Sequence, residues 1–364
     1  VVGMEQFEPW YELQMTDPLP FNMRHEVYGS RPDYSVNKEY PQVKEIWTLQ
    51  EKGDIGAGAA YSSDNVVYTT TQGYVKCVSL ASGAQKWSVK LGGKVYSTPA
   101  IYKKYVVVGC TDNIIYCLDL KTGREIWKHH CDKSVLASAN IYDGVVYIGS
   151  SDGRFRALDV KNGHMIWNFP DVKGFVESKA YVDDTQVVFG DWANTLYSLD
   201  TKTGKLMWTW KVKGSRMYSP AAVWPVKYQN RIFVVTPQRK TYSIEASSGS
   251  TMWVHRGGRE SIGLSPAGDR IVVKTMKDTV FCFSTSPAMN AEILWATDTQ
   301  IGYDIAPTPT TFADGLAFVP TDKGAIVALD SATGQIKWRY KLSFALVNYI
   351  EPVDQRRLLV TTMD

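Results

Sequence analysis

The sequence predicts an all-β fold, an eight-bladed β-propeller of four-stranded antiparallel blades. Two observations predict it. A ten-residue motif, LDLKTGREIW at 118–127, returns as LDVKNGHMIW at 158–167, LDTKTGKLMW at 199–208 and LDSATGQIKW at 329–338. Trp residues in this setting lie 40, 40, 40, 41, 45, 42 and 43 residues apart, at Trp47, Trp87, Trp127, Trp167, Trp208, Trp253, Trp295 and Trp338. A period near forty without a helical pattern is typical of a propeller blade.

The unit from Val95 to Trp127 shows the four strands of one blade. Its runs STPAIY, YVVVGC, IIYCLDL and REIW are short and rich in β-branched or aromatic residues, as strands are. Turn residues separate them, with Thr111-Asp112-Asn113 after the second run and Lys121-Thr122-Gly123 after the third. The spacing therefore predicts tight turns between successive strands of one sheet.

The motif itself has a structural explanation. Its Asp can accept hydrogen bonds from the following turn, and its Gly can adopt the positive φ that a tight turn requires. Its Trp is expected to pack between neighbouring blades. These residues are Asp119, Asp159, Asp200 and Asp330, with Gly83, Gly123, Gly163, Gly204, Gly249 and Gly334.

The two ends of the chain are expected to share the eighth blade. LVNYIEPVD and RRLLVTTMD resemble a first and a second strand, and KEIWTLQ near the start resembles a fourth. An N-terminal strand that joins the C-terminal strands closes the ring and removes a sheet edge. A third strand is expected after Asp364, where the sequence stops, so seven blades are the alternative. The propeller is assigned to residues 44–364, and residues 1–43 to an extended N-terminal segment or linker.

Composition excludes several classes of function. The chain has 364 residues, 44% hydrophobic, with a net charge of +3, which indicates a globular protein and no nucleic-acid partner. No apolar run approaches the roughly 20 residues of a transmembrane segment. The sequence shows no initiator Met and no signal peptide at its start, Val1. The chain is therefore expected to begin after processing or inside a longer protein.

The repeated pattern runs from a small residue through Asp and Thr-Gly to Trp. It resembles the repeat of the pyrroloquinoline-quinone (PQQ) type propellers. This family includes quinoprotein alcohol dehydrogenases and the outer-membrane assembly lipoprotein BamB. The pattern departs at Glu245, where Asp is expected, and in FCFSTSPAMNAEILW at 281–295, which lacks the Gly. The resemblance implies a non-catalytic binding or scaffolding protein outside the cytoplasm of a bacterium, periplasmic or attached to the envelope. Its partner would be a protein, a peptide or a small polar ligand.

Two alternatives follow from resemblance. Residues 1–43 with the propeller are similar to bacterial proteins in which a calcineurin-like metallophosphoesterase precedes such a propeller, which would make this chain its accessory domain. The other is a quinone-binding quinoprotein, many of which carry adjacent cysteines. Here Cys77, Cys110, Cys117, Cys131 and Cys282 are not adjacent, and core packing explains them. A PQQ cofactor is therefore not expected.

No catalytic or metal-binding motif is present in the sequence. The five histidines show no HExxH spacing, the cysteines no Cys-x-x-Cys pair, and no GxSxG or phosphate-binding Gly loop occurs. We therefore expect no catalytic residues and no metal in this chain.

A candidate ligand site lies at the channel mouth, where the first strands of the blades begin. Blades one to three have mostly small or apolar residues there, as in Ile55-Gly56-Ala57. Later blades have polar and bulky residues, including Glu351. The tentative site residues are Glu177, Lys179, Trp192, Arg216, Tyr218, Arg259, Glu260, Tyr303, Asp304 and Asn348. Convergent polar groups in a concavity are typical of ligand sites. The alternative is that these charges pair with one another or with channel water.

Overall fold

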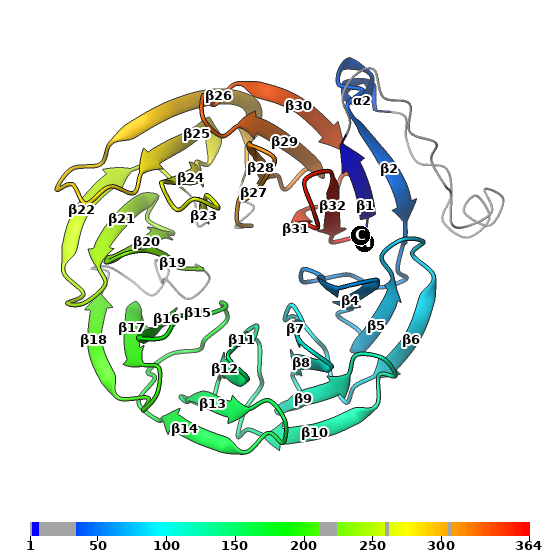
Figure 1. Cartoon of the computed structure of the whole chain (residues 1–364), viewed down its shortest axis with the longest axis vertical. Helices are drawn as coiled ribbons and strands as arrows, with labels where there is room; N and C mark the ends of the chain where they lie inside the picture. The colour runs from blue at the N-terminus through cyan, green and yellow to red at the C-terminus, as the bar shows by residue number, and fades with distance from the viewer. Residues whose placement is uncertain (1, 7–33, 212–223, 259–261, 305–307) are drawn as a thin grey trace.

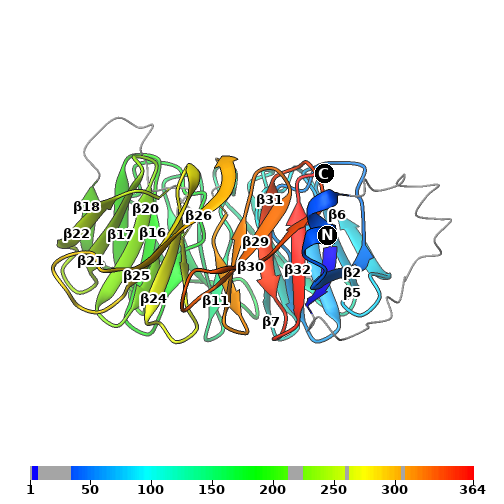
Figure 2. The ribbon, with the colours of Figure 1, turned by 90° about the horizontal axis from the view of Figure 1, so that it is seen from above.

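A computed structural model describes residues 2–6, 34–211, 224–258, 262–304 and 308–364. These residues form eight four-stranded antiparallel sheets arranged as the blades of a ring (Figure 1). Figure 2 shows the blades from the side, with strands that run between the two faces of a flat disc. The eight-bladed propeller that the repeat predicts is confirmed, and the seven-bladed alternative is wrong.

In each blade the first strand lies nearest the channel and the fourth lies at the rim. The first four blades consist of β3 (Ala60–Ser62), β4 (Asn65–Thr69), β5 (Tyr74–Ser79) and β6 (Gln85–Lys90); β7 (Ala100–Tyr102), β8 (Tyr105–Gly109), β9 (Ile114–Asp119) and β10 (Glu125–His130); β11 (Asn140–Tyr142), β12 (Val145–Gly149), β13 (Phe155–Asp159) and β14 (Met165–Phe169); and β15 (Tyr181–Val182), β16 (Gln186–Gly190), β17 (Thr195–Asp200) and β18 (Leu206–Lys211).

The next three blades follow the same order. They consist of β19 (Val226–Tyr228), β20 (Arg231–Thr236), β21 (Lys240–Glu245) and β22 (Thr251–Arg256); β23 (Ile262–Leu264), β24 (Arg270–Lys274), β25 (Lys277–Ser284) and β26 (Ile293–Tyr303); and β27 (Thr311–Ala313), β28 (Leu316–Pro320), β29 (Ala325–Asp330) and β30 (Ile336–Lys341).

The eighth blade joins the two ends of the chain. Its order is β31 (Val347–Pro352), β32 (Arg357–Thr362), β1 (Val2–Gln6) and β2 (Val43–Thr48). The N-terminal β1 pairs antiparallel with both β32 and β2, so the ring is closed as expected. The expectation that the third strand follows Asp364 is wrong, because β1 occupies that position. The propeller thus includes part of the segment 1–43, and the helix α2 (Ser35–Glu39) of that segment lies beside β30.

The repeated Asp, Gly and Trp act as expected. In the second blade, Asp119 accepts hydrogen bonds from the backbone N–H groups of Lys121 and Thr122 at 2.9 and 3.0 Å. Gly123 has a φ of +75°. Trp87 of the first blade packs against Gly123, where an added Cβ would lie 2.6 Å from the indole. The Trp87 Nε1–H also donates to the carbonyl of Leu120, so each Trp connects two blades.

Five further Trp make the same hydrogen bond to the next blade, at 2.7–3.0 Å: Trp47, Trp127, Trp167, Trp208 and Trp295. Trp253 faces the sixth blade, whose turn lacks the Gly, and makes no such bond among the described residues. It packs against Phe283 instead, with ring centroids 5.6 Å apart. Where the turn keeps its Gly, that Gly therefore contacts the Trp of the preceding blade as well as forming the turn, a contact that the sequence pattern did not reveal.

The five cysteines lie buried and unpaired in the sheets, as core packing predicts. Burial raises the pKa of each thiol, to about 11 for Cys77 and Cys131 and to about 12 for Cys110 and Cys117. Within the described residues, no helix combines the length and the apolar character that crossing a membrane requires.

Candidate functional site

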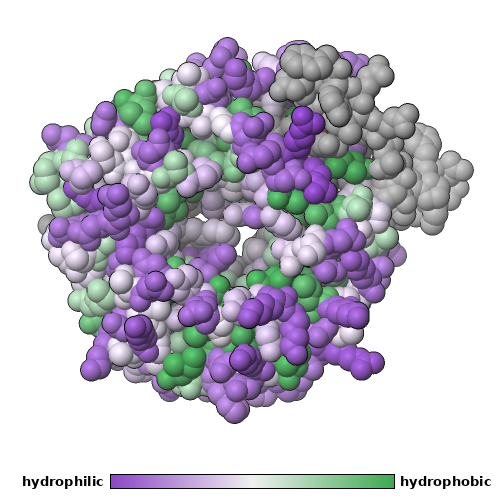
Figure 3. Space-filling model, in the orientation of Figure 1, coloured by the Kyte–Doolittle hydropathy of each residue, from purple (hydrophilic) through white to green (hydrophobic). Residues whose placement is uncertain are grey.

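The ring is hollow at its centre (Figure 3), where first strands of the blades line a channel (Figure 1). An open pocket of about 450 Å³ lies along this wall. Residues from β15, β19, β23, β27 and β31 and from the segments just before them form most of its lining. The blades that build the pocket are thus mainly the fourth to the eighth, on the side where the sequence becomes polar and aromatic.

Lys179 provides the positive charge in the pocket. It lies two residues before β15, is partly buried, and its Nζ lies 6.0 Å from the centroid of the Trp224 ring. Burial lowers the pKa of Lys179, and the charge of Glu351 opposes this shift. Among the described residues, Lys179 makes no hydrogen bond or ion pair.

Glu351 provides the negative charge from β31. Burial raises the pKa of Glu351 to about 7, and Lys179 and the neighbouring Tyr349 oppose this shift. The charges of Lys179 and Glu351 therefore interact electrostatically. They do not form an ion pair within 4.0 Å in the part of the chain that the structure describes.

Aromatic rings form the apolar part of the lining. The rings of Trp224 and Tyr349 are tilted by 34° with centroids 5.6 Å apart, although 125 residues separate them in sequence. Tyr349 packs tightly against Gly58 of the first blade, where an added Cβ would lie 2.9 Å from the Tyr349 Cβ. Burial raises the pKa of the Tyr349 hydroxyl, with Glu351 adding to the shift. The phenol is therefore neutral at physiological pH and donates a hydrogen bond to the Glu351 carboxyl.

Two threonines, Thr310 and Thr311, also line the pocket. The Oγ1 atoms of Thr310 and Thr311 are buried without a hydrogen-bond partner, and Thr310 is only 3% exposed. The backbone of Thr310 approaches Gly263 so closely that a Cβ there would lie 2.0 Å from the Thr310 carbonyl oxygen. Buried hydroxyls without partners are uncommon, because leaving them unpaired costs free energy.

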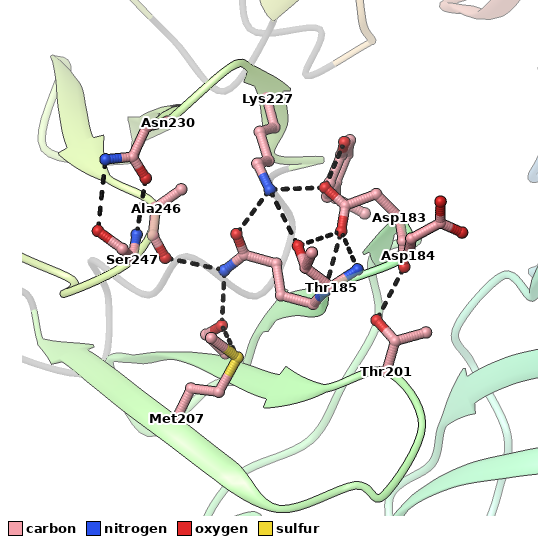
Figure 4. Close-up of polar contacts among 12 residues, drawn as sticks. Asp183, Asp184, Thr185, Thr201, Met207, Lys227, Asn230, Ala246 and Ser247 are labelled. Atoms are coloured by element: carbon pink, nitrogen blue, oxygen red, sulfur yellow. Dashed lines mark hydrogen bonds and ion pairs between the residues drawn. The ribbon is translucent and has the colours of Figure 1, made fainter.

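A network between the fourth and fifth blades borders the pocket (Figure 4). The Lys227 Nζ donates to Asp183 at 2.6 Å and to the Gln186 Oε1 at 2.8 Å, and Gln186 in turn donates to the carbonyl of Ala246 at 3.0 Å. Burial alone would raise the pKa of Asp183, but the hydrogen bonds from Lys227 and the backbone hold it at about 2. Tyr181, which lines the pocket, also donates to Asp183. The network fixes this side of the pocket.

Lys179 and Glu351 are the residues named from sequence that the structure brings to the pocket. Glu177 and Trp192 lie outside the pocket lining and near each other: burial raises the pKa of Glu177, and Trp192 opposes the shift. The backbone N–H of Trp192 donates to the Phe175 carbonyl at 3.0 Å. These two residues therefore lie apart from the pocket, where the segment before β15 meets the turn between β16 and β17.

The remaining site residues have other surroundings. Asp304 is 1% exposed and accepts hydrogen bonds from Lys274 at 2.6 Å and from the backbone N–H of Asp322 at 2.9 Å. Tyr303 is 59% exposed at the end of β26, and Asn348 donates to the Ile55 carbonyl at 2.5 Å, which connects the eighth blade to the first. None of these three lines the pocket. Arg216, Tyr218, Arg259 and Glu260 lie outside the described residues.

Sequence reasoning missed Trp224, Tyr349, Thr310 and Thr311. Each lies within or just before a first strand, so counting repeat positions in the fifth, seventh and eighth units could have found them. Trp224 has no counterpart in the first three blades and was a usable signal. The two Thr gave none, because Thr at such positions usually bonds to the neighbouring strand.

The pocket combines several kinds of chemical group. Its lining includes an ammonium group, a carboxyl group, threonine side chains and aromatic rings. Within the described residues, no group of three His, Cys, Asp or Glu side chains could hold a metal ion. The lysine and the carboxyl group can contact charged parts of a ligand, and the rings can contact apolar parts.

Comparisons with known proteins agree with the fold. The family model described as outer membrane protein assembly factor BamB matches residues 41–170, 170–288 and 287–364. Among curated proteins, a tetrathionate hydrolase of Acidithiobacillus ferrooxidans is 26% identical over 166 residues, 40% of this chain and 31% of the relative. BamB of Moranella endobia is 25% identical over 137 residues, 34% of each protein. The match thus spans about a third of each curated relative.

Solved structures show the same architecture. BamB from Moraxella catarrhalis superposes with a TM-score of 0.67 at 20% identity, covering 84% of this chain and 91% of that one. Quinohemoprotein alcohol dehydrogenase from Comamonas testosteroni gives 0.68 at 13% identity, covering 85% and 71%. The computationally designed protein Ika8 gives 0.71 at 17% identity, covering 85% and 97%. At these identities the likeness concerns the fold alone.

Proposed function

We propose that this chain, which belongs to the family described as outer membrane protein assembly factor BamB, is a non-catalytic β-propeller that binds a ligand in its central channel and serves as a binding module. The observation that carries the proposal is the pocket that Lys179 and Glu351 both line, with neither charge in an ion pair among the described residues. Charges without partners in a partly buried site destabilise the folded protein. A ligand that pairs with them would recover that free energy as affinity.

The location and partners are part of the same proposal. Relatives named outer membrane protein assembly factors support a place outside the cytoplasm, in the periplasm or at the envelope, and a protein or peptide partner besides the channel ligand. Fractionation of the native host with an antibody against the chain tests the location. Recovery with a cytoplasmic marker enzyme would overturn that part.

A quinone cofactor is not part of the proposal. PQQ in quinoproteins is bound together with a metal ion, and the described residues of this chain contain no cluster of metal ligands. The pocket offers a single ammonium group, on Lys179, to a ligand that carries several carboxylates. The residues present therefore do not fit PQQ, and adding PQQ with Ca²⁺ is expected to leave the absorbance spectra of both components unchanged.

The binding function can be tested by a thermal-shift screen of small charged and aromatic compounds. Compounds that raise the Tm of the wild-type chain should lose this effect in Lys179→Met and in Trp224→Ala, because both changes remove pocket contacts. They should keep it in Lys128→Met, which removes an exposed lysine of the rim strand β10. Hits that stabilise all four proteins equally would place binding elsewhere and contradict the proposal.

A further inference from the structure

We propose that the channel pocket binds a free α-amino acid with an apolar side chain, held by Lys179 at its carboxylate and by Glu351 at its ammonium group. This rests on the proposed binding function of the same pocket and names its ligand. The relevant observations are the opposite charges that line one cavity, the aromatic rings of its lining and the two threonines beside them, whose buried hydroxyls lack partners.

The charges require a ligand with both signs. Lys179 and Glu351 both line the pocket, yet they make no ion pair with each other or with other described residues. A zwitterion can pair with both groups at once. A monoanion would leave the carboxyl of Glu351 unpaired, and a monocation would leave the ammonium of Lys179 unpaired, at a cost in affinity in either case.

The hydroxyls and the rings fit the rest of an amino acid. A rotation of the Thr310 or Thr311 side chain would bring its unpartnered Oγ1, which is buried in the free protein, to a carboxylate or an ammonium group. The rings of Trp224, Tyr349 and Phe312 offer apolar surface to a side chain. A pocket of about 450 Å³ also matches a small molecule better than a folded partner.

The size and charge argue against a peptide segment in this pocket. The interior of a peptide carries no backbone charge, and each end carries only one. A free amino acid places its ammonium and carboxylate on the same carbon atom, so both charges enter together with a single side chain. Binding of a blocked peptide with equal affinity would contradict the proposal.

The test uses three matched probes with the full chain in isothermal titration calorimetry. L-Phenylalanine carries both charges, 3-phenylpropanoate lacks the ammonium group, and L-phenylalaninamide lacks the carboxylate. We expect L-phenylalanine to bind, and each analogue to bind at least about tenfold more weakly, which is what the loss of a charged hydrogen bond produces. Equal affinity for L-phenylalanine and 3-phenylpropanoate would show that the ammonium group is not recognised, and would overturn the proposal of a zwitterionic ligand.

Two variants assign the charges. Lys179→Met should weaken L-phenylalanine about tenfold and leave phenylalaninamide unchanged, whereas Glu351→Gln should weaken L-phenylalanine and leave 3-phenylpropanoate unchanged. Lys128→Met is the control, and circular dichroism melts show whether each variant is folded. If both variants weaken all three probes equally, the assignment of the two charges is wrong.

Proton exchange on binding gives an independent readout. An ammonium group beside Glu351 favours its ionised form, so binding should release protons at about pH 6.5, where part of that carboxyl is protonated. Titrations in buffers with different ionisation enthalpies measure the sign. Proton uptake would mean that an anion lies beside Glu351, and would overturn the proposed orientation.

The outcomes also separate this inference from the binding function. No heat with L-phenylalanine, L-leucine or L-tryptophan at about 10 mM, far above the Kd of a specific site, overturns the amino-acid proposal. If other compounds from the screen still depend on Lys179, the binding function stands and only the ligand class is wrong. If no compound depends on Lys179 or Trp224, both proposals fail.

Discussion

The two halves of the channel wall treat their polar groups differently. On the side of blades one to four, neighbouring first strands are linked: the Gly58 N–H donates to Thr98, the Thr98 N–H to Ser138, and the Asn140 amide to the Ala180 carbonyl, each at 2.9 Å. On the other side, Lys179 and the hydroxyls of Thr310 and Thr311 have no such bonds among the described residues. The groups named on the first side are therefore paired within the protein, whereas under the proposal above a ligand would pair with Lys179 on the second side.

The largest expected effect on the free energy of unfolding comes from comparing substitutions of two lysines. Lys274 is 2% exposed and paired with Asp304, so Lys274→Met removes the positive charge beside a buried carboxylate and should lower the free energy of unfolding by about 3–5 kcal/mol. Lys179→Met removes a charge without a partner and should not destabilise the fold. Urea denaturation of both variants measures the difference. Equal losses would mean that Lys179 has a structural partner, which would end the distinction between the two halves.

The next largest effect on the free energy of unfolding comes from comparing the isosteric Thr→Val change at two threonines. Thr98→Val deprives the Gly58 N–H of its acceptor and should cost about 1–2 kcal/mol of unfolding free energy. Thr310→Val removes a buried hydroxyl that has no partner and should be neutral or stabilising. The same denaturation experiment measures both. A substantial loss in Thr310→Val would show that this hydroxyl already has a partner in the free protein.

The sequence predicted the strands and turns of the blades better than it predicted the lining of the pocket. Blades, turns and the Trp contacts follow from a period of about forty residues, because each repeats a local pattern that can be read directly. The strand β1 escaped this reading because its residues VGMEQ carry no Asp-Gly-Trp motif and pair with strands at the far end of the chain. The sequence could thus predict the position of most strands but not the origin of this one.

The pocket was predictable only in part, for a physical reason. Polar residues at first-strand positions pointed to Lys179 and Glu351, but the same reasoning chose Asp304, which is an internal ion-pair partner. Whether such a carboxylate faces the channel or a buried lysine depends on the next blade. Likewise, the contact of Trp224 with Tyr349 is set by ring closure across several blades and leaves no local pattern.

The smallest effect concerns the pH dependence of stability. Burial raises the pKa of Glu351 in the folded state to about 7, above its ordinary value, so the folded protein binds more protons than the unfolded chain between about pH 4.5 and pH 7. Its contribution is therefore fully present at low pH and is lost as pH rises through this window. Because Glu351 is partly open to solvent, we expect the loss to be about 1 kcal/mol.

Glu351→Gln should remove this decline, so the variant should gain stability relative to the wild type as pH rises from about 5 to about 8. Urea denaturation at several pH values measures it, and Glu125→Gln, at an exposed rim position of β10, is the control. A zwitterionic ligand should also flatten the wild-type curve, because its ammonium group stabilises the ionised carboxyl. If the wild-type and variant curves stay parallel, Glu351 titrates normally, and the open half of the channel is more hydrated than its lining indicates.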